Sequence, residues 1–147
     1  MEQAKKHFHT ASFIVLLFAG LSLLQVVGEL IFGELNAAQI PAGSPDSILL
    51  ITKMILLGVS LVALLPKFYV GIMGLRIAKN PTPSKSHIIW ATIIFVFSLL
   101  CLVDPTVALV KRGGVYENLS ALGSILLEVL VYHDYIKCAK KVANLAE

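Results

Sequence analysis

The stretch ILLITKMILLGVSLVALLPKFYVGIMGLRIA, residues 48–78, is apolar over the length of a membrane-crossing helix, yet it carries Lys53 and Lys67. An apolar run of roughly 20 residues is enough to cross the hydrocarbon of a bilayer. A lysine inside such a helix is costly in lipid, so its side chain is expected to face protein or water. A spacing of seven places Lys53, Ser60 and Lys67 on one stripe of the helix, and we expect the other helices to pack around it.

The composition favours an integral membrane protein. The chain is 57% hydrophobic and 14% charged, whereas soluble domains average roughly 45–50% and about 25%. The net charge of +3 is small and the lysines do not gather on one amphipathic face, so no nucleic-acid partner is expected. The two cysteines, Cys101 and Cys138, stand in no CxxC or Cys/His metal spacing, and neither a metal nor a cofactor is expected.

Three further apolar runs of similar character are separated by short polar or proline-containing segments. We therefore predict an all-α integral membrane protein, a single domain over residues 1–147 in which four transmembrane helices form a compact bundle with short loops. The predicted spans cover residues 11–33, 48–78, 87–109 and 116–137. The first span follows Lys5 and Lys6 but ends without a small-residue cleavage site, so we interpret it as a retained helix and not as a signal peptide.

The distribution of basic residues predicts the orientation of these spans. Two of them, Lys111 and Arg112, fall between the third and fourth spans. Eight fall on the opposite side, which holds both termini and the loop between the second and third spans: Lys5, Lys6, Arg76, Lys79, Lys85, Lys137, Lys140 and Lys141. Because basic residues concentrate on the cytoplasmic side, both termini are predicted to be cytoplasmic in a multi-pass protein of the plasma membrane.

Two opposite charges fall at the same predicted depth. Lys67 lies nine residues before Arg76, and Glu128 lies nine before Lys137; these basic residues mark the cytoplasmic ends of two spans. At about 1.5 Å per residue, both side chains lie about 13 Å from that edge, near the middle of a hydrocarbon layer roughly 30 Å thick. An unpaired charge is strongly disfavoured there, so we predict that Lys67 and Glu128 contact each other.

Ser60 and Ser124 lie on the same polar faces as these charges and belong to the predicted mid-membrane site. The site has two interpretations. The ion pair either fixes the register of two helices as a structural element, or it forms a site for a substrate or a proton.

A second set of polar residues is predicted to form an outer cluster, because its members lie near the outer ends of three spans: Glu29, Lys53, Asp104 and Gln25. Such a cluster is either a partly solvated rim or a site for a cation or basic group. Near the cytoplasmic end of the fourth span, His133 and Asp134 point about 100° apart on a helix and do not form a catalytic pair. With Tyr135 they are interpreted as an interfacial anchor.

Three functions are compatible with these patterns. No metalloprotease, serine-hydrolase, P-loop or dinucleotide motif is present, and no catalytic residue is proposed. The first hypothesis is therefore a non-enzymatic assembly, regulatory or immunity-type subunit that acts through helix contacts. The alternative is a small oligomeric transporter or channel that uses Lys67 and Glu128, and the second alternative is a membrane enzyme acting on lipid. The expected partners are the lipid bilayer and another copy or another membrane protein.

Overall fold

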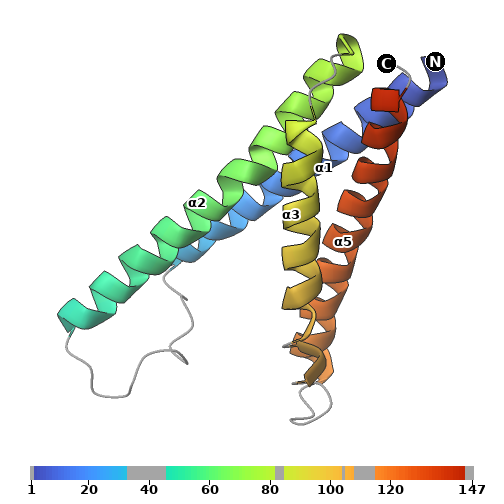
Figure 1. Ribbon diagram of the computed structural model, residues 1–147. Coiled ribbons are helices and arrows are strands. Elements are labelled where there is room, and N and C mark those ends of the chain that lie inside the picture. Colours follow the sequence, from blue (N-terminus) through green and yellow to red (C-terminus); the bar gives the residue numbers. More distant parts are fainter. Residues whose placement is uncertain (1, 33–45, 82–84, 104, 108–114, 145–147) are drawn as a thin grey trace.

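The computed structural model describes residues 2–32, 46–81, 85–103, 105–107 and 115–144. Its main elements are four helices: α1 (Glu2–Phe32), α2 (Asp46–Lys79), α3 (Ser86–Cys101) and α5 (Val115–Asn144) (Figure 1). Four segments are long and apolar enough to cross a membrane: Glu2–Gly28, Leu50–Lys79, Ser86–Val107 and Leu119–Asn144. For the residues that the structure describes, the prediction of an all-α fold with four such helices is confirmed.

Two of the helices extend beyond the predicted spans at the ends that carry the termini. α1 begins at Glu2 instead of residue 11, and α5 continues to Asn144 instead of ending near residue 137. Both extensions lack glycine and proline and contain alanine, glutamate or lysine, which favour helix. They also pack: Phe8 in the first extension and Ala139 and Val142 in the second are buried.

The third predicted span is divided by a proline. α3 ends at Cys101, and Pro105 opens a short helical turn at residues 105–107. Proline lacks the backbone N–H that would continue the helical hydrogen bonds, so a break is expected near this point. The hydrogen bonding changes to the 3₁₀ type there, because the amide of Leu102 donates to the carbonyl of Leu99, three residues earlier, at 3.2 Å.

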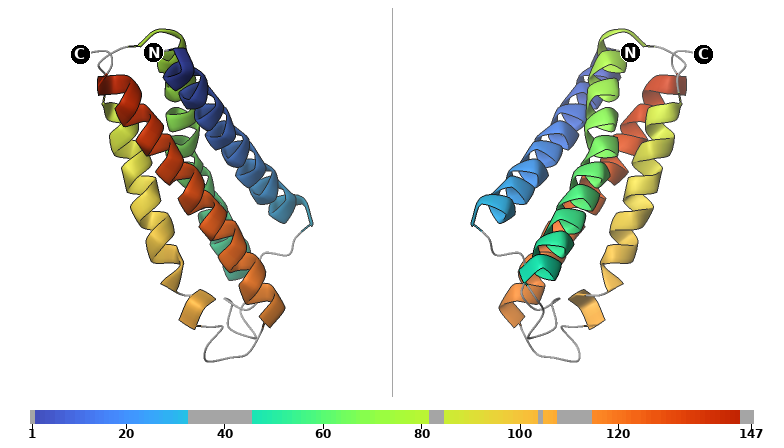
Figure 2. Two further views of the ribbon diagram at one scale, coloured as in Figure 1. Left: turned by 90° about the vertical axis from the view of Figure 1, so that its right-hand side faces the viewer. Right: turned by 90° about the vertical axis from the view of Figure 1, so that its left-hand side faces the viewer.

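The helices form a ring in which α1 packs beside α2 and α5, and α3 packs beside α5 and α2. α2 and α5 are therefore diagonal neighbours across the middle of the bundle. Figures 1 and 2 show both termini at one end, together with the end of α2 and the start of α3. We call this the closed end. From it the α1–α2 pair and the α3–α5 pair diverge toward the opposite end, which we call the open end (Figure 1).

The hydrophobic core lies toward the closed end. Every helix contributes to it, with Phe8, Ala11, Val15, Val70, Ile77, Ala91, Ile94, Tyr132, Tyr135, Ala139 and Val142 among its buried members. Toward the open end the large apolar side chains are mostly exposed, for example Leu24, Ile55 and Leu100. Apolar side chains exposed on every helix fit segments that are long and apolar enough to cross a membrane.

Small residues bring α1 and α2 together at the closed end. A Cβ built on Gly71 would lie 3.2 Å from the Cα of Leu16 in α1, and one on Gly74 would lie 2.7 Å from the hydroxyl oxygen of Tyr135 in α5. Glycine at position 71 thus lets the backbone of α2 lie close to that of α1, and glycine at position 74 leaves space for the side chains of Ser12 and Tyr135. Small residues have this role in apolar helix bundles, where the attraction between helices comes from close packing.

Candidate functional site

Lys67 and Glu128 form an ion pair across the diagonal of the bundle. The ammonium nitrogen of Lys67 in α2 lies 2.6 Å from Oε1 of Glu128 in α5. Both side chains are about one fifth exposed, at 21% and 22%. Charge-assisted hydrogen bonds of this length are strong, and removing one partner leaves the other charge in an apolar setting. The structure therefore brings together the two charges whose contact was predicted from sequence.

A cavity of about 540 Å³ lies beside this ion pair, between α2, α3 and α5. Lys67 and Glu128 form its charged wall, and Trp90, Ile94 and Phe97 of α3 contribute to the apolar part. Sites for small molecules typically have volumes of roughly 300–1,000 Å³, with mostly apolar walls and a few convergent polar groups. The ion pair thus belongs to the wall of a ligand-sized cavity and is not enclosed in packed protein.

A second cavity of about 340 Å³ lies on the other side of Lys67, between α1 and α2. Lys67 and Ala63 belong to the walls of both cavities. The polar side chains Ser22, Gln25 and Ser60 line the smaller one. Lys67 therefore lies between two cavities. The larger is mostly apolar and is also lined by Glu128, and the smaller is more polar.

The two serines predicted to belong to the site have different positions. Ser60 is half-buried on α2 and lines the smaller cavity, two turns from Lys67. Ser124 is exposed, and its hydroxyl donates to the carbonyl of Ala121 in its own helix at 2.9 Å. Ser60 thus belongs to the surroundings of Lys67, whereas the hydrogen bond of Ser124 stays within α5.

The predicted outer cluster falls largely outside what the structure describes. Asp104 and the side chains of Glu29 and Lys53 lie outside the described part. Gln25 is described, and it lines the smaller cavity in which Lys67 also takes part. The outer cluster of Glu29, Lys53 and Asp104 therefore stays a prediction.

The closed end contains a group of buried contacts that the sequence did not indicate. Tyr135 is fully buried, and its hydroxyl donates to the carbonyl of Val70 in α2 at 3.1 Å. The ring of Phe8 lies 5.3 Å from that of Tyr135, and His87 meets Tyr135 edge-on at 6.2 Å. Residues from all four helices thus meet around Tyr135.

The interpretation of Tyr135 as part of an interfacial anchor is therefore wrong. The adjacent residues behave differently, because His133 and Asp134 are exposed and the ring of His133 lies 6.2 Å from Phe95. The available signal was spacing, since Tyr132 and Tyr135 are three apart and Ala139 follows four residues later, which places all three on one helix face. These three side chains are buried together.

Tyr132 is a further buried polar residue near the ion pair. It lies one helical turn from Glu128 on the same face of α5, and it is 1% exposed. Among the described residues its hydroxyl has no hydrogen-bond partner. Buried hydroxyls are normally satisfied, so this atom marks a place where water or a ligand group would be favourable.

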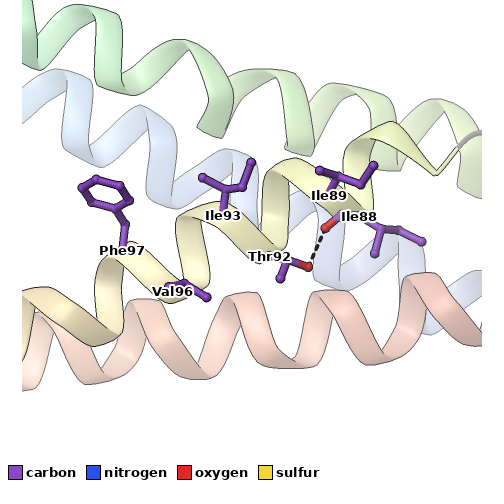
Figure 3. Close-up of a pocket in the computed structure, with 6 residues that line it drawn as sticks. All are labelled: Ile88, Ile89, Thr92, Ile93, Val96 and Phe97. Carbon is purple, nitrogen blue, oxygen red and sulfur yellow. Dashed lines mark hydrogen bonds between the residues drawn. The ribbon is translucent and has the colours of Figure 1, made fainter.

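An apolar groove of about 470 Å³ runs along the outer side of α3. Figure 3 shows Ile89, Ile93 and Phe97 projecting from one side of this helix, four residues apart. The hydroxyl of Thr92 also lines the groove, but it donates to the carbonyl of Ile88 at 2.8 Å and is satisfied within the helix (Figure 3). Ile93 and Phe97 line both this groove and the larger cavity, so the two spaces are neighbours.

Within the described part of the chain, no group of three or more His, Cys, Asp or Glu side chains is placed to hold a metal ion. Comparison of the chain with protein-family models, with curated proteins and with solved structures finds no match. Function is therefore inferred from the arrangement of the chain's own residues.

Proposed function

We propose that this chain is a four-span integral membrane protein that binds a small ligand at the Lys67–Glu128 pair and works as a small transporter. The observation that carries this proposal is the position of the pair on the wall of a cavity of about 540 Å³. A purely structural pair needs only the contact between its two side chains and hydrogen bonds for their remaining polar atoms. A pair that borders a ligand-sized cavity has a surface available for binding.

The positions of the basic residues support an orientation in which the closed end is cytoplasmic. Lys5 and Lys6 lie at the start of α1, and Arg76 and Lys79 lie at the end of α2. Three further lysines, Lys137, Lys140 and Lys141, lie near the end of α5. All of these helix ends meet at the closed end (Figure 1). With this end cytoplasmic, as the positive-inside rule favours, the open end faces the outside of the plasma membrane.

Four membrane-crossing helices offer little wall with which to enclose a pathway for transport. We therefore propose that the protein works as an oligomer, in which another copy packs against the apolar side chains exposed on the helices. The apolar side chains exposed on every helix suit such contacts as well as contacts with lipid tails.

Mass spectrometry of the protein released intact from detergent micelles tests both parts of the proposal. The wild type is expected to be larger than a monomer and to retain a small molecule that resists mild activation. The double variant Lys67→Met with Glu128→Leu is expected to keep the oligomeric state and to lose the small molecule. A monomeric wild type with no bound species, matched by the double variant, would contradict the proposal.

The second candidate function is a non-enzymatic assembly, regulatory or immunity-type subunit that acts through helix contacts. The large apolar side chains exposed on every helix favour it, since they offer surface for contact with the helices of another membrane protein. In that case the double variant would retain function, because apolar replacements preserve the contact surface. The membrane-enzyme alternative has less support, because exposed His133 lies about 140° around α5 from Glu128.

A further inference from the structure

We propose that the cavity between α2, α3 and α5 binds a neutral single-chain amphiphile, a molecule with one hydrocarbon tail and an uncharged hydroxyl-bearing head, such as a monoacylglycerol or a fatty alcohol. The head contacts Lys67 and Glu128, and the tail lies along α3. This inference rests on the proposed function and specifies the ligand class for the same site.

The charged wall selects an uncharged head. Lys67 and Glu128 neutralise each other at 2.6 Å, so the wall has no net charge but offers both N–H donors and carboxylate oxygens. A charged head would compete with one partner for the other and leave a charge without compensation in an apolar setting. A hydroxyl can donate to the carboxylate of Glu128 and accept from the ammonium of Lys67 while the ion pair stays intact.

The depth of the pair points to the same class of head. Lys67 and Glu128 both lie inside the long apolar segments, and their spacing from Arg76 and Lys137 predicts that both lie near the middle of a membrane. A phosphate or carboxylate head would have to leave the aqueous interface with its charge to reach them, which is strongly disfavoured. A hydroxyl head is less costly to move, and it regains its hydrogen bonds at the ion pair.

The apolar walls of the larger cavity and of the groove along α3 favour a single hydrocarbon tail. Apart from the ion pair, the walls of the larger cavity are mostly apolar, with Ile93, Ile94 and Phe97 on the side formed by α3. Ile93 and Phe97 are also shared with the outer groove of α3, which continues past Ile89 (Figure 3). A chain whose head sits at Lys67 can thus pass Phe97 and Ile93 and lie in the groove. This path accommodates one tail beside the helix.

Access is lateral, from the lipid. Phe97 and Ile93 are 67% and 44% exposed, so the boundary between the cavity and the groove lies on the outer surface of the described helices. A membrane-dissolved ligand can therefore enter between α2 and α3 without crossing the packed closed end. This route suits an amphiphile and does not suit a water-soluble solute.

The chain contains a natural reporter for this site. Trp90 is the single tryptophan of the sequence, and it lines the larger cavity. Bromine atoms quench tryptophan fluorescence on contact, so a monoacylglycerol with a dibrominated tail reports occupancy directly. The protein is placed in phosphatidylcholine nanodiscs, the brominated monoacylglycerol is added at low mole fraction, and the unlabelled monoacylglycerol is used as competitor.

We expect saturable quenching of Trp90 that the unlabelled monoacylglycerol reverses. Brominated fatty acid in its anionic form and brominated lysophosphatidylcholine should give only the weak, non-saturating quenching of a lipid-exposed tryptophan. Lys67→Met with Glu128→Leu should weaken the saturable component by about tenfold or more, which corresponds to the loss of one good hydrogen-bonded contact.

Two further variants separate binding from folding. Ala63→Phe fills the cavity without removing a charge, and because Ala63 is exposed the larger side chain does not disturb the core. It should abolish saturable quenching. Leu24→Ala changes an exposed side chain of α1 away from the cavity and should leave quenching at the wild-type level.

Several results would overturn the assignment. Equal, non-saturable quenching in the wild type and in Ala63→Phe would show that the monoacylglycerol contacts Trp90 only as bulk lipid. Tighter binding of the anionic fatty acid would show that the head is charged. If either result is found while mass spectrometry shows another species lost in the double variant, the proposed function stands and only the ligand class fails.

Discussion

The hydroxyl of Tyr135 donates to the backbone carbonyl of Val70 at 3.1 Å, which joins α5 to α2 although these helices lie diagonally across the bundle. The contact is buried, and the ring of Tyr135 also meets Phe8 of α1 and His87 of α3. Tyr135 lies seven residues along α5 from Glu128, whose ion pair with Lys67 also links the same two helices. At the closed end α2 and α5 are therefore joined by a buried neutral hydrogen bond, and beside the cavity they are joined by an ion pair.

Tyr135→Phe should lower the free energy of unfolding by about 0.5–1.5 kcal/mol, because it removes one buried hydrogen bond and keeps the ring packed. The measurement is denaturant-induced unfolding in detergent micelles, followed by the fluorescence of Trp90. Tyr69→Phe is the matched control, since its hydroxyl bonds to Ser86 at an exposed position. A loss in the control as large as that in Tyr135→Phe would contradict the special role of the buried contact.

Gly74→Ala should destabilise the protein more than the tyrosine change. The added methyl group would meet the side chains of Ser12 and Tyr135. Overpacking of this kind costs about 1–3 kcal/mol. Gly123→Ala is the matched control, because nothing lies within 4 Å of its Cβ position, and alanine in an open helix is favoured over glycine by about 0.5–1 kcal/mol. The same unfolding measurement should therefore show changes of opposite sign, and a stabilised Gly74→Ala would contradict the close packing.

The number and approximate positions of the helices could be predicted because long apolar segments separated by polar breaks are a strong signal. The Lys67–Glu128 contact could also be inferred, since two opposite charges in apolar helices each need a partner. The buried position of Tyr135 was not predicted, because an aromatic residue beside His133 and Asp134 fits an interface as well as a core, and its spacing from Tyr132 and Ala139 was the signal that favoured the core. The cavity could not be foreseen either, since its volume depends on how far two helix pairs diverge, and no local pattern encodes that angle.

Both termini are predicted to be cytoplasmic, because eight basic residues lie on their side of the apolar segments. In a background with Cys101→Ser and Cys138→Ser, single cysteines at Asn80 and Ser44 should differ in reactivity toward a membrane-impermeant maleimide on intact cells. Ser44→Cys should react, and Asn80→Cys should react only after the cells are permeabilised. The reverse pattern would show that the protein is inserted in the opposite orientation.

Lys67→Met alone and Glu128→Leu alone should each destabilise the protein by about 3 kcal/mol, the lower end of the range for breaking a buried ion pair, because each side chain retains about one fifth exposure. The double variant should recover most of that loss, since neither charge is left without a partner and similar volumes are kept. The coupling energy, measured by unfolding of all four proteins in micelles, should be about 4 kcal/mol or more, because the two single losses add to about 6 kcal/mol and the double variant keeps only a small part of one of them. Additive losses would show that the two side chains act independently. The double variant also separates the two roles of the pair, because a structural pair leaves it folded and able to retain ligand, whereas a binding site leaves it folded and empty.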